Sequence, residues 1–342
     1  MNVTRAGRGK PRRKAALVLL ALVLLSVALL VLGSGVGSTG FESVWNARHD
    51  PIAMQIVRDI RAPRAAGAWL AGALLGMAGA VAQGLFRNPL ADPYLLGSAS
   101  GASLGVAVAV VLLGTTPFAT EWLLRLGLTG AAFAGAVGAV FLTLLLARGV
   151  QHTFRLLLAG LVVGVVAGAF GSLITMMRPE VMLTMQGFML GSTSFVGWTA
   201  CALMATAWLV CVQIAWVLSP ALDGLSLGEA TASSLGLPLP QMRAALVAVL
   251  ALATGTAVAQ TGLIAFVGLA APHLVRSGVK TTHGLFILMS SVMGGVLLLA
   301  ADTLARWLIA PQELPVGVLT AVLGGGYLLW LMHRRSARGG TW

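Results

Sequence analysis

Long runs of apolar residues dominate the chain, and short polar segments separate them. Ten runs can be distinguished, at Ala15–Leu32, Ala65–Ala82, Tyr94–Leu113, Leu126–Ala147, Leu156–Met177, Phe195–Leu218, Ala244–Ala259, Gly262–Ala271, Leu285–Ala301 and Val316–Met332. Most are close to the ~20 residues that a helix needs to cross a bilayer. The pattern predicts an all-α polytopic membrane protein with ten transmembrane helices. Because the runs are continuous rather than alternating, they exclude a transmembrane β-barrel.

The eighth run, Gly262–Ala271, is only half as long as a spanning helix and is followed by Pro272. A half-length helix at membrane depth must be shielded by protein or must line a cavity, because its ends carry unpaired backbone groups. We therefore expect a short eighth helix that ends at Pro272 and that is either shielded by protein or lines a cavity.

The composition agrees with a membrane protein. The 342 residues are 58% hydrophobic and only 9% charged, against about 25% charged residues in soluble domains. The net charge of +12 does not indicate nucleic acid, because the basic residues lie between the apolar runs and at the chain ends. Cys201 and Cys211 share one apolar run and are interpreted as small buried side chains rather than a disulfide or a metal site.

Both chain ends are basic, which places them on the cytoplasmic side. We divide the chain into a basic tail at 1–14, one membrane domain at 15–333 and a second basic tail at 334–342. The start resembles a signal peptide, but its apolar run is longer than usual and no A-x-A site follows, so an uncleaved first helix is predicted. Threading ten spans from these ends puts several basic residues inside, namely Arg87, Arg148, Arg155, Arg243, Arg276 and Lys280.

The segment Pro220–Arg243 is the main polar interruption between spans. Asp223 or Ser226 is a candidate cap for a short helix that runs through Leu235, and Gly236 would stop it. We expect two short cytoplasmic helices within about 220–237, although an ordinary amphipathic loop is the alternative. The chain has no G-x-x-x-x-G-K-[ST] motif, so any ATP must be bound by another chain.

Five motifs together resemble a known family. They are Arg61-Ala-Pro-Arg64, the segment Gln83–Gly97 (QGLFRNPLADPYLLG), Ser226–Gly236 (SLGEATASSLG), Phe266–Arg276 (FVGLAAPHLVR) and Glu313–Thr320 (ELPVGVLT). In this order they are similar to the permease subunits of ATP-driven importers for vitamin B12, ferric siderophores and haem, over essentially Ile60 to Trp330. The resemblance implies a homodimer in the bacterial inner membrane, with a pathway on its two-fold axis. It also implies two cytoplasmic ATPase subunits that carry ATP and Mg, and a periplasmic substrate-binding protein; the chain itself would hold no cofactor and catalyse no reaction.

The resemblance assigns roles to residues at both ends of the helices. On the cytoplasmic side, the residues expected to contact the ATPase are Asp223, Gly224, Ser226, Gly228 and Glu229. On the outer side, Arg61, Arg64 and Arg306 match positions that face the binding protein, where an arginine fork suits a carboxylate. The alternative for these arginines is an anchor at the lipid headgroups.

The cargo is predicted from the outer end of the fifth run. There Met176, Met177 and Arg178 match a region that borders the channel in the family. Flexible methionines suit a flat apolar macrocycle and an arginine suits a propionate, so haem is the leading cargo, with cobalamin or a ferric siderophore as alternatives. Arg178 could instead pair with Glu180 or extend to the interface.

Further residues have structural or gating interpretations. Asn88-Pro89 and Asp92-Pro93 mark a turn, and Asp92 either contacts the ATPase or, as we favour, caps the third helix. Pro272 and His273 are expected to be structural or gating residues. Two other classes fit less well: an ion-coupled transporter needs carboxylates at mid-membrane, and an intramembrane enzyme needs a paired nucleophile and base.

Overall fold

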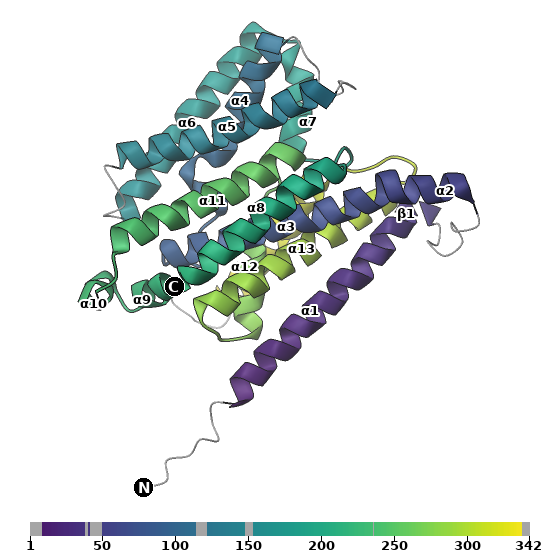
Figure 1. Ribbon diagram of the computed structural model, residues 1–342. Coiled ribbons are helices and arrows are strands. Elements are labelled where there is room, and N and C mark those ends of the chain that lie inside the picture. The colour runs from purple at the N-terminus through teal and green to yellow at the C-terminus, as the bar shows by residue number, and fades with distance from the viewer. Residues whose placement is uncertain are drawn as a thin grey trace.

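The computed structural model describes residues 9–37, 40–41, 50–113, 122–147, 153–234 and 236–336. These ranges are almost entirely helical (Figure 1). The elements are α1 (Gly9–Gly35), β1 (Val36–Gly37), β2 (Gly40–Phe41), α2 (Pro51–Ile56), the π-helical η3 (Val57–Arg61), α3 (Ala62–Leu85), the 3₁₀ turn η4 (Pro93–Leu96), α4 (Ser98–Leu113), α5 (Trp122–Leu146), α6 (Thr153–Met177), α7 (Val181–Leu190), α8 (Trp198–Val217), α9 (Ser219–Ser226), α10 (Glu229–Ser234), α11 (Leu239–Thr261), α12 (Val267–Gly278), α13 (His283–Trp307) and α14 (Val316–Ser336). The strands β1 and β2 form a short antiparallel pair.

Seven of the described helical segments are long and apolar enough to cross a membrane. They are Arg13–Gly35, Pro51–Leu85, Gly127–Leu146, Phe154–Met177, Trp198–Val217, Leu239–Thr261 and His283–Trp307, and shorter apolar helices cover Ser98–Leu112, Val181–Leu190 and Val316–Leu331. Each predicted apolar run overlaps a helix. The prediction of a largely α-helical, multi-pass membrane protein is therefore confirmed.

The helices α3 and α13 form the centre of the bundle (Figure 1). In the most apolar 18-residue stretch of the span Pro51–Leu85, which includes α3, 83% of the residues are buried. In the corresponding stretch of Arg13–Gly35 in α1, only 17% are buried. Gly72 and Gly76 of α3 lie against α13, where an added Cβ would come within 2.2 Å of the Gly294 carbonyl oxygen and 2.3 Å of the Ser290 carbonyl oxygen. Small residues thus let the two backbones pack closely, as is usual in membranes.

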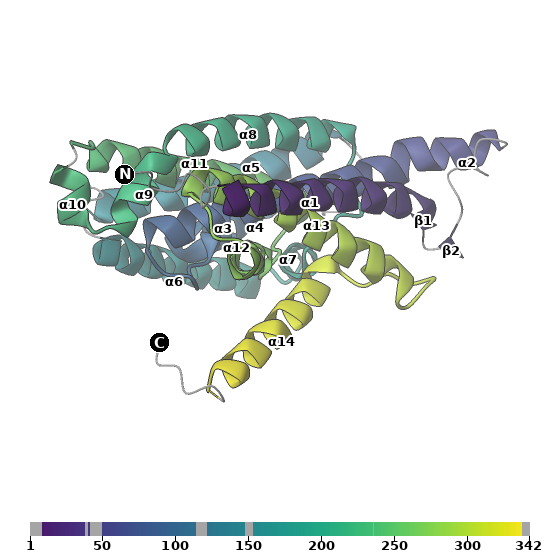
Figure 2. The same ribbon diagram turned by 90° about the horizontal axis from the view of Figure 1, so that it is seen from below.

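A second group of helices, α4 to α7, packs beside this centre at the top of Figure 1. Gly101 and Gly105 of α4 contact α5, where an added Cβ would lie 2.3 Å from the Gly135 carbonyl oxygen and 2.1 Å from the Ala131 carbonyl oxygen. The outer face of α6 is uncovered, with Leu161 and Val165 each more than 60% exposed. The helix α14 points away from the bundle (Figure 2) and exposes Leu329.

The predicted bounds of the eighth helix are wrong. The helix α12 begins at Val267 and continues through Pro272 to Gly278. Residues 262–266 are not helical, because Gly262 and Phe266 adopt φ angles of 69°. Pro272 lacks an N–H group and therefore leaves the Gly268 carbonyl without its usual helical donor. That carbonyl lies against Gly79 of α3, where an added Cβ would be 1.7 Å from the oxygen.

Two further helical segments were not predicted. The helix α7 occupies the methionine-containing segment after Arg178. The second span begins earlier than its apolar run, because Asp50 caps α2 through its side chain and α2, η3 and α3 follow one another without a break. Among the basic residues placed from the sequence, Arg148 and most of both tails lie outside the described residues.

Candidate functional site

A buried cluster of charges joins the start of α3 to the end of α13. The carboxylate of Asp302 is fully buried and forms ion pairs with Arg64 (Nη2–Oδ1 3.2 Å) and with Arg306 (Nη2–Oδ2 2.7 Å). Thr193, in the loop after α7, donates its hydroxyl hydrogen to the same carboxylate. Isolated buried charges cost several kcal/mol each, so this mutual pairing is what allows three ionised groups to lie inside the bundle.

Arg306 also ties the end of α1 to the cluster. Its Nη1 donates hydrogen bonds of 2.8 Å to the carbonyl oxygens of Gly33 and Val36. The carbonyl groups at a helix C-terminus lack helical donors and carry partial negative charge, so a guanidinium satisfies them well. The guanidinium of Arg61 packs against the adjacent Gly37, where an added Cβ would lie 2.7 Å from Nη2.

Glu313, in the loop before α14, extends the cluster toward solvent. Its Oε2 accepts a hydrogen bond of 2.8 Å from Arg64 Nη1 and one of 3.3 Å from the Ser194 hydroxyl. The Glu313 side chain is 26% exposed, whereas that of Asp302 is 0% exposed. The cluster therefore connects α1, α3 and α13 to the loops that follow α7 and α13, and Glu313 is its accessible carboxylate.

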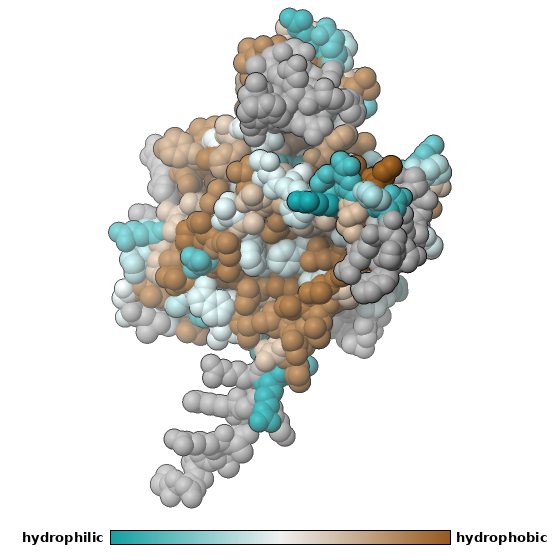
Figure 3. Space-filling model, turned by 45° about the vertical axis from the view of Figure 1, so that its right-hand side comes forward, coloured by the Kyte–Doolittle hydropathy of each residue, from teal (hydrophilic) through white to brown (hydrophobic). Residues whose placement is uncertain are grey.

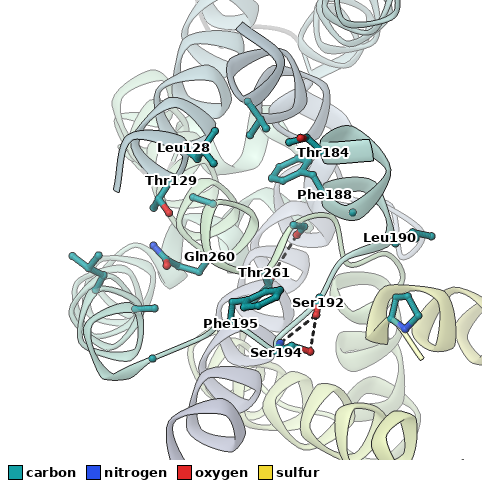
Figure 4. Close-up of a pocket in the computed structure, with 18 of the residues that line it drawn as sticks. Leu128, Thr129, Thr184, Phe188, Leu190, Ser192, Ser194, Phe195, Gln260 and Thr261 are labelled. Atoms are coloured by element: carbon teal, nitrogen blue, oxygen red, sulfur yellow. Dashed lines mark hydrogen bonds between the residues drawn. The ribbon is translucent and has the colours of Figure 1, made fainter. Parts of the chain in front are cut away.

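A cavity of about 700 Å³ opens beside this cluster. Glu313 and Ser194 belong both to its wall and to the charge cluster. Figure 4 shows Thr129 and Gln260 on one side of the cavity, Phe188 on the opposite side, and Phe195 below them near Ser194. Its lining is mainly apolar with a few hydroxyl and amide groups, which is typical of a site for a small amphipathic molecule.

The structure brings together the three arginines predicted to dock a binding protein. Arg61, Arg64 and Arg306 lie at the same end of the bundle, but they are only 7%, 8% and 1% exposed. Arg64 and Arg306 already have carboxylate partners within the chain. The docking role stays a prediction, and the internal pairs are the feature that the sequence analysis did not foresee.

The residues predicted to contact cargo lie elsewhere, at the junction of α6 and α7. Met176 and Met177 are 74% and 70% exposed, and Arg178 is also exposed. Among the described residues Arg178 forms no ion pair, so the predicted alternative of a pair with Glu180 is absent from this conformation. The pathway role of these three residues stays a prediction.

At the opposite end of the bundle, Asp223 links α9 to the start of α13. Its Oδ1 accepts hydrogen bonds from the backbone N–H of His283 (3.1 Å) and lies 2.7 Å from His283 Nδ1. A carboxylate at this position satisfies a free N–H of the first helical turn and complements the helix dipole. The prediction that Asp223 or Ser226 caps the helix ending near Leu235 is wrong, since both residues lie within α9 and Asp223 instead accepts from the first N–H of α13. Leu235 itself lies outside the described residues.

Glu229, the first residue of α10, makes a second link from the short helices to the bundle. Its Oε1 lies 2.6 Å from Nη2 of Arg243 in α11 and 4.0 Å from Nη2 of Arg87 after α3. Arg243 is 6% exposed at its side chain, whereas Glu229 is 37% exposed. Because a largely buried arginine needs a counter-charge, Glu229 holds α10 on α11.

Glycines fix the shape of this pair of short helices. Gly224 lies inside α9, where an added Cβ would come within 2.8 Å of the Leu237 side chain and 3.5 Å of Ala232. Gly228 and Gly236 flank α10 with φ angles of 109° and 75°, a conformation that favours glycine. The prediction of two short helices in this segment therefore agrees with α9 and α10.

The turn between α3 and α4 packs against the segment around α12. Asp92 Oδ1 accepts a 2.8 Å hydrogen bond from the Tyr94 backbone N–H, so Asp92 caps the 3₁₀ turn η4, which ends at Gly97 before α4 begins, rather than α4 itself. Burial raises the pKa of Asp92 above its ordinary value, while the bond from Tyr94 acts in the opposite direction. Asn88 Oδ1 similarly accepts from the Leu90 N–H at 2.9 Å.

Pro93 and His273 show how closely this region is packed. A Cβ added at Gly268 would lie 2.4 Å from Pro93 Cγ. His273 of α12 is 8% exposed, and its ring centroid lies 5.9 Å from that of Tyr327 in α14. His273 thus connects α12 to α14 through a ring contact, and its structural or gating role stays a prediction.

Three residues that carry much of this geometry, Asp302, Glu313 and Arg243, were not among the predicted site residues. Asp302 and Arg306 are four residues apart in one helix, so their pairing follows from helical spacing. Glu313 and Arg243 have partners distant in the chain. Only the occurrence of a lone charged residue beside an apolar run pointed to them.

Comparisons with known proteins give a consistent result. A family model described as the FecCD transport family matches residues 18–334. The hemin transport system permease protein HmuU of Yersinia pestis is 36% identical, over 98% of this chain and 99% of that protein. The vitamin B12 import system permease protein BtuC of Salmonella typhi is 38% identical, over 92% of this chain and 95% of that protein. A solved inward-facing conformation of a metal-chelate type ABC transporter is 27% identical, covers 93% of this chain and 99% of its own, and has a TM-score of 0.83.

Proposed function

Because this chain belongs to the FecCD transport family, we propose that it is the membrane-spanning permease subunit of an ATP-driven importer in the bacterial inner membrane. The observation that carries this proposal is the family match across 18–334, joined to a bundle with a charged cluster at one end and short, charge-anchored helices at the other. We assign it ten membrane crossings, with a membrane domain at 15–333 and cytoplasmic basic tails at 1–14 and 334–342.

The helices α9 and α10 are the proposed contact for a cytoplasmic ATPase. They lie between α8 and α11 and project from the end of the bundle (Figure 1). Asp223 and Glu229 connect them to α13 and α11 respectively, while Gly224, Ser226 and Gly228 shape them. A motor that moves this pair as a rigid unit would thereby move two long helices.

The uncovered apolar faces support a homodimer. Leu161 and Val165 of α6 are 62% and 63% exposed, and Val322 and Leu329 of α14 are 66% and 69% exposed. Part of such surface faces lipid, and part is available for a second copy. We propose a translocation pathway between two copies, with Met176, Met177 and Arg178 at its outer mouth.

The outer charge cluster is the proposed docking site for a periplasmic substrate-binding protein. Glu313 is the more exposed of the two carboxylates that pair with Arg64. An incoming carboxylate could therefore replace Glu313 as a partner of Arg64, while Asp302 keeps its buried ion pairs with Arg64 and Arg306. In this arrangement Arg61 and Arg306 support the site from within rather than face the partner.

Haem is the proposed cargo, with cobalamin as the second candidate. The matching hemin permease and the vitamin B12 permease support each in turn. A methionine pair next to Arg178, all exposed at the α6–α7 junction, favours an apolar ring system with acidic side groups. ATP and Mg would be bound by the ATPase partner, and this chain would carry cargo without a cofactor of its own.

The test is uptake by vesicles that contain the permease and its ATPase, with the binding protein and labelled cargo supplied outside. We expect ATP-dependent uptake of haem, reduced by Arg178→Ala and unaffected by the same change at Arg58, which is an exposed arginine of η3 and not part of the α6–α7 junction. ATP-dependent uptake of cobalamin in place of haem would reject the cargo and keep the importer. Uptake of either without the ATPase would reject the importer itself.

A further inference from the structure

A second cavity, of about 310 Å³, lies between the start of α1 and the end of α12. Its lining consists of Lys14 and the segment Arg276–Lys280. The three charged residues of the lining, Lys14, Arg276 and Lys280, are all cationic. Across the described parts of the chain, none of the three forms an ion pair.

One of these cations is held in place by the protein. The guanidinium carbon of Arg276 lies 4.8 Å from the centroid of the Phe286 ring, a favourable cation–π arrangement. Phe286 is itself only 5% exposed, so the ring is a fixed support on α13. The cavity therefore gathers three positive charges from two separate segments, and like charges gathered without a counter-charge favour an anion between them.

The surroundings of the cavity indicate that the anion carries an apolar tail. Lys14, Leu17 and Leu24 recur at helical spacing and share one face of α1. Leu17 and Leu24 are 66% and 60% exposed, so this face is left open to the bilayer. At the lower end of the molecule in Figure 3, hydrophilic atoms lie directly below a continuous hydrophobic surface. A charged headgroup held at the cavity would leave its acyl chains along this face.

We propose that the cavity lined by Lys14, Arg276 and Lys280 binds the phosphate-bearing headgroup of an anionic phospholipid, whose acyl chains lie along α1. The placement of this cavity at the inner leaflet rests on the orientation given under the proposed function. A lone soluble phosphate would use the cations but not the apolar face. Each lysine or arginine beside a spanning helix raises the affinity for anionic lipid by roughly 5-fold.

The test measures which lipid stays with the full-length permease after exchange against equal amounts of phosphatidylglycerol and phosphatidylcholine. Native mass spectrometry reports the bound lipid. Wild type should retain phosphatidylglycerol, and K14Q/K280Q should lose this preference by roughly 25-fold, the product of two charges. Two controls should keep it: K14R/K280R preserves both charges, and R155Q removes an exposed arginine at the start of α6 that does not line the cavity.

The remaining outcomes each overturn the proposal. Equal retention of the two lipids by wild type, or a preference kept by K14Q/K280Q, would show that no headgroup site exists. Displacement of phosphatidylglycerol by millimolar inorganic phosphate would assign the cavity to a soluble anion. Displacement of phosphatidylglycerol by purified ATPase subunit would assign the cavity to a protein contact.

If K14Q/K280Q fails to fold, K280Q alone should show a roughly 5-fold loss of the preference for phosphatidylglycerol. Because lipid retention is measured without cargo and without transport, its failure would leave the result of the uptake assay independent.

Discussion

Asp302→Asn should strongly destabilise the permease while preserving the shape of its side chain. Asp302 is 0% exposed and accepts from Arg64, Arg306 and Thr193. Replacing it leaves Arg306, 1% exposed, without its carboxylate. Breaking one partner of a buried pair costs about 3–5 kcal/mol. Arg306 keeps the Gly33 and Val36 carbonyls, and Arg64 keeps Glu313, so the lower figure of ~3 kcal/mol applies.

The assay is thermal unfolding of the purified full-length protein in one detergent. On the scale of domains of 150–250 residues, a loss of ~3 kcal/mol corresponds to a fall in Tm of roughly 6–12 °C. Glu180→Gln is the matched control, because Glu180 is exposed and its side chain makes no capping hydrogen bond. Its Tm should stay within about 2 °C of wild type, since surface changes are usually within ±0.5 kcal/mol.

A double variant separates charge pairing from simple loss of packing. Asp302→Leu with Arg306→Met removes both partners, so neither leaves a bare charge, and replacing a buried pair by apolar groups is often close to neutral. We expect the double variant to lose less stability than the sum of the two single variants. If Asp302→Asn melts with wild type, or if the two single losses simply add, the cluster does not stabilise the fold as described.

Three shorter predictions follow from other contacts. Gly79→Ala places a Cβ 1.7 Å from the Gly268 carbonyl oxygen and should lower the free energy of unfolding by about 1–3 kcal/mol. Gly138→Ala is the control and should leave stability unchanged, because nothing lies within 4 Å of its added Cβ. Equal Tm values for the two variants would contradict the close α3–α12 contact. Asp223→Ala removes the group that accepts from the His283 N–H and should cost ~1 kcal/mol of unfolding free energy, most of which Asp223→Asn should recover; equal losses would refute the capping role. Glu229→Gln weakens the 2.6 Å pair with Arg243 and should lower cargo transported per ATP hydrolysed more than it lowers Tm, and an unchanged ratio in the vesicle assay would reject Glu229 as a coupling residue.

Most of the helical framework could be predicted from the sequence because it depends on local properties. A run of about twenty apolar residues has few options other than a spanning helix, and each of the ten runs overlaps a helix in the structure. The glycine spacing at Gly72 and Gly76 predicts a close helix contact but does not say with which helix. The partner, α13, became known only from the folded chain.

The errors arose where distant parts of the chain determine the local conformation. Pro272 is a strong signal for a helix end, yet α12 continues past it because neighbouring helices enclose the segment and offset the lost hydrogen bond. The observed eighth helix, Val267–Gly278, therefore lies further toward the C-terminus than the predicted run Gly262–Ala271. The helix α7 follows directly after a charged segment and is only ten residues long, so its apolar pattern did not stand out from a loop.

The candidate site was predicted in composition but not in geometry. Arg64, Asp302 and Glu313 are visible in the sequence as isolated charges beside apolar runs, and only their folded positions show that they neutralise one another. Asp302 directly follows the apolar run Leu285–Ala301, close to where an ion-coupled transporter would need a carboxylate. Its two arginine partners instead make it a fixed counter-charge, which weakens the case for an ion-coupled transporter.

The positions of these charges suggest how force could travel through the subunit. The helix α13 is 25 residues long, or about 37 Å at 1.5 Å per residue, and it is anchored at both ends. At its start, His283 is bound by Asp223 of α9, and at its end, Asp302 and Arg306 bind α3 and the end of α1. Because glycines hold α13 against α3 along its length, the two helices should move as one rigid body. A displacement of α9 would then reach the Asp302 cluster at the other end of α13 without deforming the bundle. The loops bearing Thr193 and Glu313 are where that movement would meet the 700 Å³ cavity.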